Sequence, residues 1–422
     1  MRILVLNRSN LATTPYAQWL GPAHEVVLVT STGAISTDPD RARAELSGYR
    51  EVVTFDRFHT NAAVETTALD LHRRHGFDAV IAMNEYDLLR AARLREAMGI
   101  DGQGTAEAEA FRDKLRMKEL LTAAGVRTAP FAPVAHVTDL YAFAADHGYP
   151  FVVKPRRGAG STGVEVLRDA DALAAYAEAH PALGDDDGAA LLAEAYVGHE
   201  LFHIDGLIVA GTTVLVWPSA CTSALTYREG TVFTSTTLDA QDPLTEPLRE
   251  LTLRAVRALS AWPTLTFHAE VFRTADGTLL LNEIASRVGG GKIYEAVRLA
   301  TGVDLVREYV QAVGDDTVHR PPVDRPERTA GFALFPGSPG TLAAAPAEGT
   351  CEVAGVDQYR LNVPVGTFLG VAEHSSARIA SVVVGGADRA AAEAVLAEAV
   401  GWFRAACAIT PPEPEPEPDP AP

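Results

Sequence analysis

Two short stretches of this chain join an apolar strand to side chains that could bind an anion or a metal. The first, Phe151-Val152-Val153-Lys154, ends in a lysine and runs into a glycine-rich turn at 158–163. The second, 279–287, carries a carboxylate at Glu283 and ends in Arg287. A lysine beside backbone N–H groups suits phosphate oxygens, and a carboxylate at a strand end suits Mg²⁺. Together they predict a magnesium–nucleotide site.

Lys154 by itself has a second interpretation, in which its ammonium reaches solvent from the end of a buried strand. The following turn favours anion binding, because Gly158, Gly160 and Gly163 leave backbone N–H groups free to face phosphates. The turn is not a P-loop, since Gly-x-x-x-x-Gly-Lys-Ser/Thr is absent. A plain hairpin connection is the alternative.

Glu270 and Glu283 are predicted to lie on the two strands of one β-hairpin. Asp276-Gly277 separates two apolar runs, and this dipeptide is a strong hairpin signal. Carboxylates within apolar runs need a partner. We therefore expect either a shared Mg²⁺ or salt bridges to Arg273 or Arg287.

Arg287 precedes the glycine run Gly289-Gly290-Gly291. A guanidinium beside a flexible backbone suits a carboxylate or an acyl phosphate, which it can bind through two hydrogen bonds. The alternative is a structural arginine at a loop entrance. His203 and His268 follow strand patterns, where a core histidine is favoured over a metal ligand.

Composition and charge limit the class of protein. A chain of 422 residues predicts roughly two to four domains. The net charge of −19 argues against nucleic acid or an anionic membrane as the main partner, although a small polyanion can still bind in a locally positive site. The three cysteines lack metal spacing, and neither a signal peptide nor a spanning apolar stretch is present. We expect a soluble cytoplasmic protein.

The first hundred residues alternate apolar runs with helical patterns, which predicts a parallel α/β sheet. The runs are 3–6, 26–29, 52–55 and 79–82. No Gly-x-Gly-x-x-Gly follows the first run, which argues against a dinucleotide-binding Rossmann domain. Beyond this sheet we expect one helix from 108 to about 124 and a strand-rich stretch over 150–235.

In chain order these features resemble the ATP-grasp superfamily of carboxylate–amine ligases, and the resemblance spans nearly the whole chain. It is closest in pattern to bacterial L-amino acid ligases, with a C-terminal unit from Gly331 similar to that of biotin carboxylases. The segments that carry it are Asn84-Glu85-Tyr86-Asp87-Leu88-Leu89, residues 111–118, Val153-Lys154-Pro155 with its glycine turn, residues 194–200, and Glu270 with Asn282-Glu283 and Arg287.

The resemblance implies an ATP-grasp fold, α/β overall and α+β in the nucleotide clamp. The expected units are a pre-ATP-grasp α/β domain (1–100), clamp part A with a glycine-rich lid (101–188), clamp part B with the metal-binding hairpin (189–328), a β-rich C-terminal unit (329–408) and a disordered Pro/Glu tail (409–422).

The resemblance also implies roles for individual residues, with ATP and Mg²⁺ (or Mn²⁺) as cofactors. Arg287, Lys154 and Glu283 would be catalytic, and Glu270 and Glu283 would coordinate the metal. The expected nucleotide-binding residues are Lys114, Lys154, Gly158, Gly160, Ser161, Thr162, Gly163, Glu194, the Val197 backbone and Glu200.

The chain departs from a common family pattern directly after the second glutamate. Many relatives have Glu-x-Asn before the arginine, whereas this chain has Glu283-Ile284-Ala285. The missing asparagine leaves open whether one or two metal ions bind. A similar Asn-Glu-Ile-Ala run occurs in the ATPase subunit of phosphoribosylaminoimidazole carboxylase, so the change is compatible with activity.

The implied function is ATP-dependent coupling of a small carboxylate to an amine through an acyl phosphate. The alternatives are carboxylation through carboxyphosphate and a nucleotide-binding protein without activity. The expected partners are small-molecule substrates, with no nucleic acid or membrane, and a homodimer is compatible with the fold. The substrate-lining candidates are Glu85, Tyr227, Arg228, His268, Gly290 and Gly291.

Overall fold

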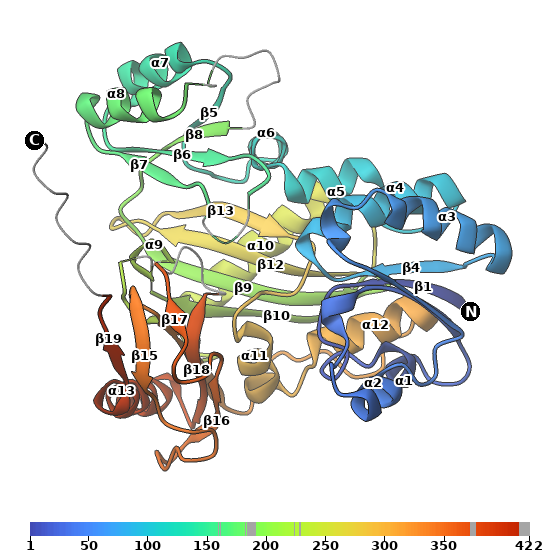
Figure 1. The fold of residues 1–422 in the computed structure, drawn as a ribbon. Helices are drawn as coiled ribbons and strands as arrows, with labels where there is room; N and C mark the ends of the chain where they lie inside the picture. The colour runs from blue at the N-terminus through green and yellow to red at the C-terminus, as the bar shows by residue number, and fades with distance from the viewer. Residues whose placement is uncertain are drawn as a thin grey trace, which may run out of the picture.

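The computed structural model describes residues 1–158, 160, 162–181, 183, 191–222, 224–227, 229–371 and 377–412. A four-stranded parallel sheet forms the N-terminal part, and three antiparallel sheets of four, eight and three strands follow (Figure 1). The expected α/β architecture is confirmed. Within the described residues, no helix combines the length and apolar character needed to cross a membrane.

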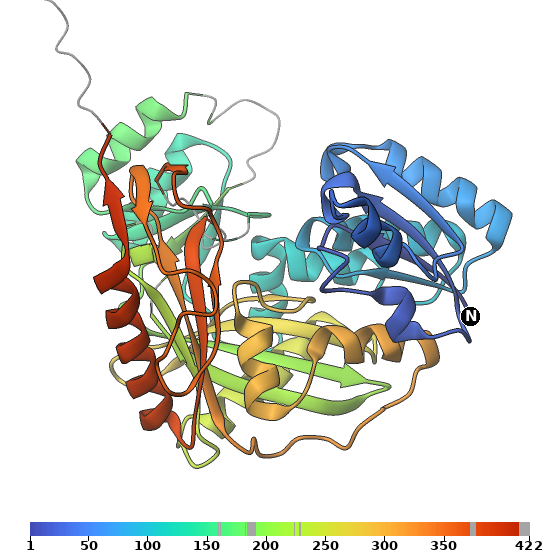
Figure 2. The same ribbon diagram turned by 60° about the horizontal axis from the view of Figure 1, so that its bottom comes forward.

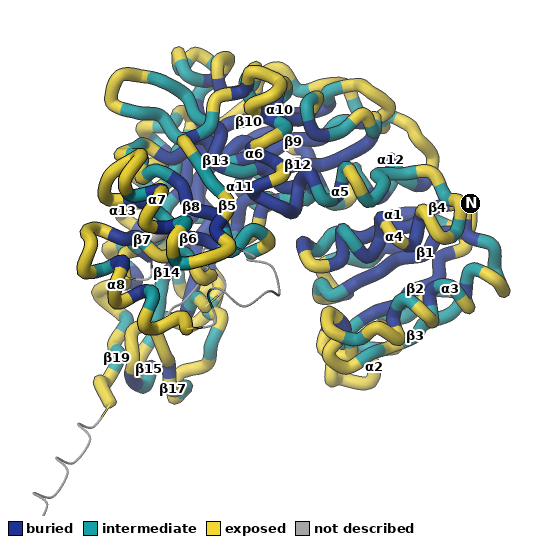
Figure 3. The backbone as a smooth tube through the Cα atoms, turned by 90° about the horizontal axis from the view of Figure 1, so that it is seen from above, coloured by how far each residue is buried: buried dark blue, intermediate teal, exposed yellow. Residues whose placement is uncertain are grey.

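The N-terminal sheet has the order β3-β2-β1-β4 with all strands parallel. Strands β1, β2 and β4 are mostly buried, because helices cover both faces of the sheet. The edge strand β3 is less buried, and α2 is exposed (Figure 3). The four apolar runs found in the sequence are its strands. The elements are β1 (Arg2–Asn7), α1 (Tyr16–Leu20), β2 (Glu25–Ser31), η1 (Thr32–Ala34), α2 (Pro39–Glu45), β3 (Glu51–Phe55), η2 (Phe58–Thr60), α3 (Ala63–His75), β4 (Ala79–Ala82), η3 (Glu85–Asp87) and α4 (Leu88–Met98).

The single helix expected over 108–124 is wrong, because the segment forms α5 (Thr105–Arg112) and α6 (Lys114–Ala123). Asp113 separates them with an extended backbone, at φ −101° and ψ 106°. Its carboxylate accepts the N–H groups of Leu115 and Arg116, and so caps the second helix. Lys114 consequently lies in the first turn of a new helix.

A small antiparallel sheet in the order β5-β8-β6-β7 carries the strand that ends at Lys154. Two helices that the sequence analysis did not predict pack on this sheet. Asp139 takes part in a capping box at the start of one, and Asp169 caps the other. The elements are β5 (Phe131–Val134), α7 (Val137–His147), β6 (Phe151–Pro155), β7 (Glu165–Leu167), α8 (Ala170–Ala179) and β8 (Leu191–Ala195).

The largest sheet has eight strands in the order β13-β12-β9-β10-β11-β14-β18-β16. Helix α10 packs on one face, and α11 and α12 pack on the other (Figure 2). The pairing of β11 with β14 carries this sheet across the expected domain boundary at 328. Its elements are β9 (Glu200–Val209), β10 (Thr212–Cys221), α9 (Ala224–Tyr227), β11 (Phe233–Thr237), α10 (Thr245–Leu259), β12 (Leu265–Arg273), β13 (Leu279–Ala285), α11 (Ile293–Thr301), α12 (Leu305–Asp315), β14 (Thr329–Pro336), β16 (Val356–Leu361) and β18 (Arg378–Gly386).

The C-terminal part adds a three-stranded sheet and a long helix that packs on β14 and β18. These elements are β15 (Gly340–Ala344), β17 (Phe368–Leu369), α13 (Arg389–Ala406) and β19 (Ala408–Thr410). Residues 413–422, which make up most of the expected tail, lie outside the described part of the chain.

Candidate active site

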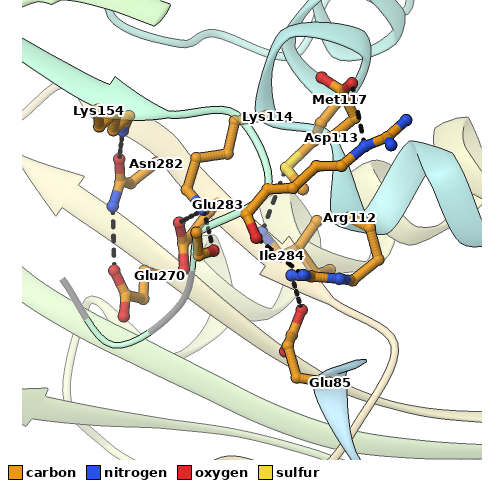
Figure 4. A network of polar contacts seen from close by, with 12 residues as sticks. Glu85, Arg112, Asp113, Lys114, Met117, Lys154, Glu270, Asn282, Glu283 and Ile284 are labelled. Carbon is orange, nitrogen blue, oxygen red and sulfur yellow. Dashed lines mark hydrogen bonds and ion pairs between the residues drawn. The ribbon is translucent and has the colours of Figure 1, made fainter. Parts of the chain in front are cut away.

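The predicted hairpin of Glu270 and Glu283 is present as β12 and β13, and the two glutamates are direct partners in its ladder. The register shifts after Glu270, which leaves Asn282 as an extra residue in β13. Such a bulge re-aims side chains. Asn282 donates to Glu270 Oε2 over 3.0 Å and accepts from Lys154 over 3.2 Å (Figure 4). The bulge thus places an amide between the lysine and the carboxylate.

Lys154 points inward from β6 rather than into solvent. Its Nζ forms an ion pair with Glu194 Oε2 at 2.6 Å. Burial alone would lower the pKa of Lys154, but Glu194 and Glu283 outweigh it and raise that pKa. The ammonium is therefore charged at neutral pH.

Lys118 is a member of this cluster that the sequence analysis missed. It is fully buried, and its Nζ lies 3.2 Å from Glu194 Oε1 and 3.0 Å from the carbonyl oxygen of Asn282. Burial lowers the pKa of Lys118 to about 8. The available signal was its spacing, since it lies one helical turn after Lys114 and on the same side of α6.

Glu194 is consequently buried between two lysines. Burial would raise the pKa of its carboxyl, but Lys118 and Lys154 hold that pKa below its ordinary value. Its expected contact with adenine stays a prediction. Val197 lies in the segment between β8 and β9, and Glu200 forms an ion pair with Arg273 at 2.8 Å.

Lys114 joins the hairpin to the glycine turn. Its Nζ lies 3.0 Å from Glu283 Oε2 and donates to the carbonyl oxygen of Gly158 over 2.9 Å. Burial would raise the pKa of Glu283, but Lys114 and Lys154 lower it to about 2. Gly160 and Gly163 have positive φ, which glycine adopts readily. Thr162 is exposed, and Ser161 lies outside the described residues.

Arg287 contacts Glu85 of the N-terminal domain, and the other oxygen of Glu85 contacts Arg112. Burial would raise the pKa of Glu85, but the two guanidinium groups hold it below its ordinary value. Among the described residues, Glu270 and Glu283 do not form the salt bridges to Arg273 or Arg287 that were the alternative to a metal site. Arg273 pairs with Glu200 and Arg287 pairs with Glu85, while Lys114 pairs with Glu283.

The comparison with known families decides the class. Residues 119–291 match the model of the ATP-grasp domain, and this range contains the hairpin, Lys154, Glu194 and Arg287. The chain thus contains an ATP-grasp domain. Its fold agrees, since the structure superposes on an L-amino acid ligase from Bacillus licheniformis with a TM-score of 0.75 at 19% identity, covering 98% of this chain and 99% of the other.

Two curated enzymes and a further solved structure are similar over most of the chain. An L-arginine-specific L-amino acid ligase of Bacillus subtilis is 27% identical over 74% of this chain and 76% of its own length. Dapdiamide A synthase of Enterobacter agglomerans is 27% identical over 69% and 70% of the two chains. The biotin carboxylase domain of 2-oxoglutarate carboxylase from Hydrogenobacter thermophilus shares the fold, with a TM-score of 0.69 at 19% identity, over 97% and 90%.

A cluster of buried polar side chains lies on strands β9, β11 and β12, next to the hairpin of Glu270 and Glu283. His203 and His268 both contact Asp205, at 2.6 and 2.9 Å, and Ser235 Oγ lies 2.6 Å from His203 Nε2. Burial would lower the pKa of His268, but Asp205 outweighs it and raises it to about 9. His268 Nε2 lies 3.9 Å from Glu270 Oε1. His268 is thus placed as a buried neighbour of Glu270, as expected for a core histidine.

The remaining substrate candidates are placed differently. Gly290 and Gly291 belong to the loop that follows Arg287, and a Cβ at the adjacent Gly289 would lie 2.7 Å from Asp205 Oδ1. The loop therefore packs directly on the buried histidine–aspartate pair. Tyr227 is buried in α9, and Arg228 lies outside the described residues.

The hairpin residues fit a divalent cation. Glu270, Glu283 and the side chain of Asn282 offer oxygen donors, which Mg²⁺ prefers. The low pKa of Glu283 keeps it ionised at neutral pH, as a metal ligand must be. Because of the bulge, Asn282 supplies an amide oxygen on this side of the hairpin, where the side chain of Ala285 offers none.

Proposed function

We propose that this protein is an ATP- and Mg²⁺-dependent ligase that activates a small carboxylate as an acyl phosphate and couples it to an amine, with release of ADP and phosphate. The observation that carries the proposal is the convergence of Lys114 and Lys154 on Glu283, Asn282 and Glu270 between β6, α6 and the hairpin. The names of the similar ligases support the same chemistry.

The nucleotide would bind between the small sheet and the hairpin. Lys114 and Lys154 would contact phosphate oxygens, together with backbone N–H groups of the 158–163 turn. Glu270 and Glu283 would hold Mg²⁺, which neutralises negative charge on the phosphates when it is bound. Glu194, the Val197 backbone and Glu200 would face the nucleoside.

Arg287 would hold the reacting carboxylate. A carboxylate resists attack by an amine because oxide would have to leave, whereas an acyl phosphate can release phosphate. The contact of Arg287 with Glu85 fixes its guanidinium beside the N-terminal domain. The lysines offset charge that gathers during phosphoryl transfer. The amine then attacks the acyl carbon, an amide bond forms, and the C–O bond to phosphate breaks.

We also infer that the protein acts in the cytoplasm on small molecules. Its cysteines Cys221, Cys351 and Cys407 are free thiols, which suits a reducing compartment. The five segments expected from the sequence, with boundaries at 100, 188, 328 and 408, are our proposed domain division, and homodimer formation is part of the same proposal.

Carboxylation through carboxyphosphate is the second candidate. One observation favours it, since 144 residues are 34% identical to the small subunit of 2-oxoglutarate carboxylase from Hydrogenobacter thermophilus. That match covers 32% of this chain and 28% of the subunit, and it spans less than half as many residues as the match to the L-arginine-specific ligase.

The test is phosphate release from ATP and Mg²⁺ with a pooled panel of amino acids and small acids, with bicarbonate omitted and then added. Release that needs two organic substrates, with the amide product seen by mass spectrometry, is the expected result. Release that needs bicarbonate would instead support the carboxylase. ATP binding without any release would contradict both and leave an inactive nucleotide-binding protein. Glu283→Gln serves as the inactive control.

A further inference from the structure

An arginine and an exposed tyrosine meet at the carboxyl edge of the N-terminal sheet. Arg8 directly follows β1, and Tyr86 follows β4. The chain runs from β1 outward to β2 and β3, and β4 then pairs with the other side of β1. The ends of β1 and β4 therefore flank the point where the strand order reverses. In open parallel sheets, ligands bind outside the carboxyl ends of strands at this point.

The contacts of Arg8 place its guanidinium at this edge of the sheet. Its Nη1 donates to Asn84 Oδ1 over 3.1 Å, and its Cζ lies 5.4 Å from the centre of the Tyr86 ring. Asn84 also accepts the N–H of Tyr86, so one side chain orients both residues. Within the part of the chain that the structure describes, Asn84 is the only hydrogen-bond partner of the Arg8 side chain. Its remaining N–H groups are available to a ligand.

The same tyrosine links Arg8 to the candidate active site. Arg112 Cζ lies 5.8 Å from the Tyr86 ring, and Arg112 meets Arg287 on the carboxylate of Glu85. Tyr86 is 55% exposed, so its ring is accessible to a ligand. The ring lies between Arg8 and Arg112, and Arg112 shares Glu85 with Arg287, the arginine proposed to hold the reacting carboxylate.

Positive charge exceeds negative charge among the groups around Tyr86. Arg112 and Arg287 share the one carboxylate of Glu85, while Asp87, whose charge Arg8 also faces, is already paired with Arg90 at 2.9 Å. The chain as a whole has a net charge of −19, so the local excess is opposite in sign to the rest of the molecule. Such an arrangement attracts a substrate with more than one negative group.

We propose that Arg8, oriented by Asn84 beside Tyr86, binds a substrate carboxylate that the reaction does not consume. This inference rests on the proposed ligase function, in which Arg287 holds the carboxylate that reacts. The free carboxylate can come from the amine substrate, as in an α-amino acid, or from a dicarboxylic acid. In both cases Arg8 sets substrate specificity, because an amide in that place cannot accept a charge-assisted pair of hydrogen bonds.

The first arm of the test needs no turnover. Calorimetric binding is measured for the twenty amino acids, succinate and glutarate, each with a carboxamide counterpart such as L-alaninamide, succinamate or glutaramate. The proteins are the full chain, Arg8→Gln, Arg8→Lys and Arg2→Gln. Arg2 is the matched control, because it pairs with Asp78 at the opposite end of β1 from Arg8.

The expected result is that a carboxylate probe binds wild type at least about ten-fold more tightly than its amide. Arg8→Gln removes this preference, Arg8→Lys restores part of it, and Arg2→Gln keeps it. Selective binding of an α-amino acid assigns the amine substrate, and selective binding of succinate or glutarate assigns the acid. Wild type that binds no carboxylate probe, or a preference that survives Arg8→Gln, would overturn the inference.

The second arm uses phosphate release. With the substrates that support turnover, Arg8→Gln should raise KM for the carboxylate-bearing substrate about ten-fold or more, while KM for ATP and for an amide analogue stays unchanged. Equal increases for acid and amide would show a merely structural role. If wild type releases no phosphate with any pair, the ligase proposal fails, and the binding arm still decides whether Arg8 selects a carboxylate.

Discussion

Lys154 Nζ donates to Asn282 Oδ1 over 3.2 Å, although the two residues are 128 positions apart in the chain. The contact joins the small sheet to the bulged strand of the hairpin (Figure 4). Because Asn282 also donates to Glu270, a lysine suited to phosphate and a carboxylate suited to a metal share one amide. The position of each depends on the other, and this relationship leads to the first two predictions.

Replacing Lys154 with methionine should weaken binding of ATP by about ten-fold or more, because a charged phosphate partner is lost. Calorimetry with a non-hydrolysable ATP analogue measures the change. Arg116→Met is the matched control, since Arg116 is exposed on α6 and pairs with the equally exposed Glu119 at 3.6 Å. Unchanged nucleotide affinity in a folded Lys154→Met protein would remove this lysine from the site.

Glu283→Gln should abolish Mg²⁺-dependent phosphate release, by about a hundred-fold or more, while the protein stays folded. The substitution keeps the shape of the side chain and removes the charge that a metal ion requires. Phosphate release is measured across a range of Mg²⁺ concentrations, with Glu119→Gln on the exposed side of α6 as the control. Full activity of Glu283→Gln would defeat the metal assignment.

Gly206→Ala should destabilise the fold by about 3 kcal/mol or more. Gly206 lies in the central strand β9, where an added Cβ would lie 2.2 Å from Phe267 Cζ and 2.7 Å from the carbonyl oxygen of Leu215. Urea unfolding measures the change. Gly401→Ala in α13 has nothing within 4 Å of its Cβ and should instead stabilise the protein, by up to about 1 kcal/mol. Equal effects at both positions would contradict the packing argument.

His268 should titrate near pH 9 in the metal-free protein rather than near its ordinary 6.5, because Asp205 stabilises its charged form. NMR of histidine labelled at Cε1, assigned with His268→Gln, measures this pKa. Asp205→Asn should lower it. A His268 pKa near 6.5 in the wild-type protein would show that Asp205 does not govern the ring.

The same pair gives a dependence of stability on pH. Folding raises the pKa of His268 from 6.5 to about 9, so the charged ring stabilises the folded protein. This contribution to the free energy of unfolding is fully present below about pH 6.5 and is lost as the pH rises through about 9. The shift corresponds to about 3 kcal/mol. Urea unfolding gives the free energy of unfolding of wild type and of Asp205→Asn at each pH from 6 to 10. The difference between the two proteins should fall over this range. A difference that is independent of pH would contradict it.

Local sequence determined the elements and the order of the motifs. The buried strands of the N-terminal sheet were evident as apolar runs, since a parallel sheet covered on both faces needs them. The hairpin of Glu270 and Glu283 followed from Asp276-Gly277, because this turn favours antiparallel pairing of the flanking strands. These features depend on residues close together in the chain.

The tertiary structure alone decided which charged groups meet. The spacing of apolar residues predicted one continuous helix, but Asp113 divides it into two. Its carboxylate caps α6 and pairs with Arg156 at 2.6 Å. Lys118 pairs with Glu194, and Arg287 pairs with Glu85, which lies 202 positions earlier in the chain. A buried charge takes whichever opposite charge packing brings near, and that distance is set by the whole fold. The residue types of the site were therefore readable from the sequence, whereas their pairing was not.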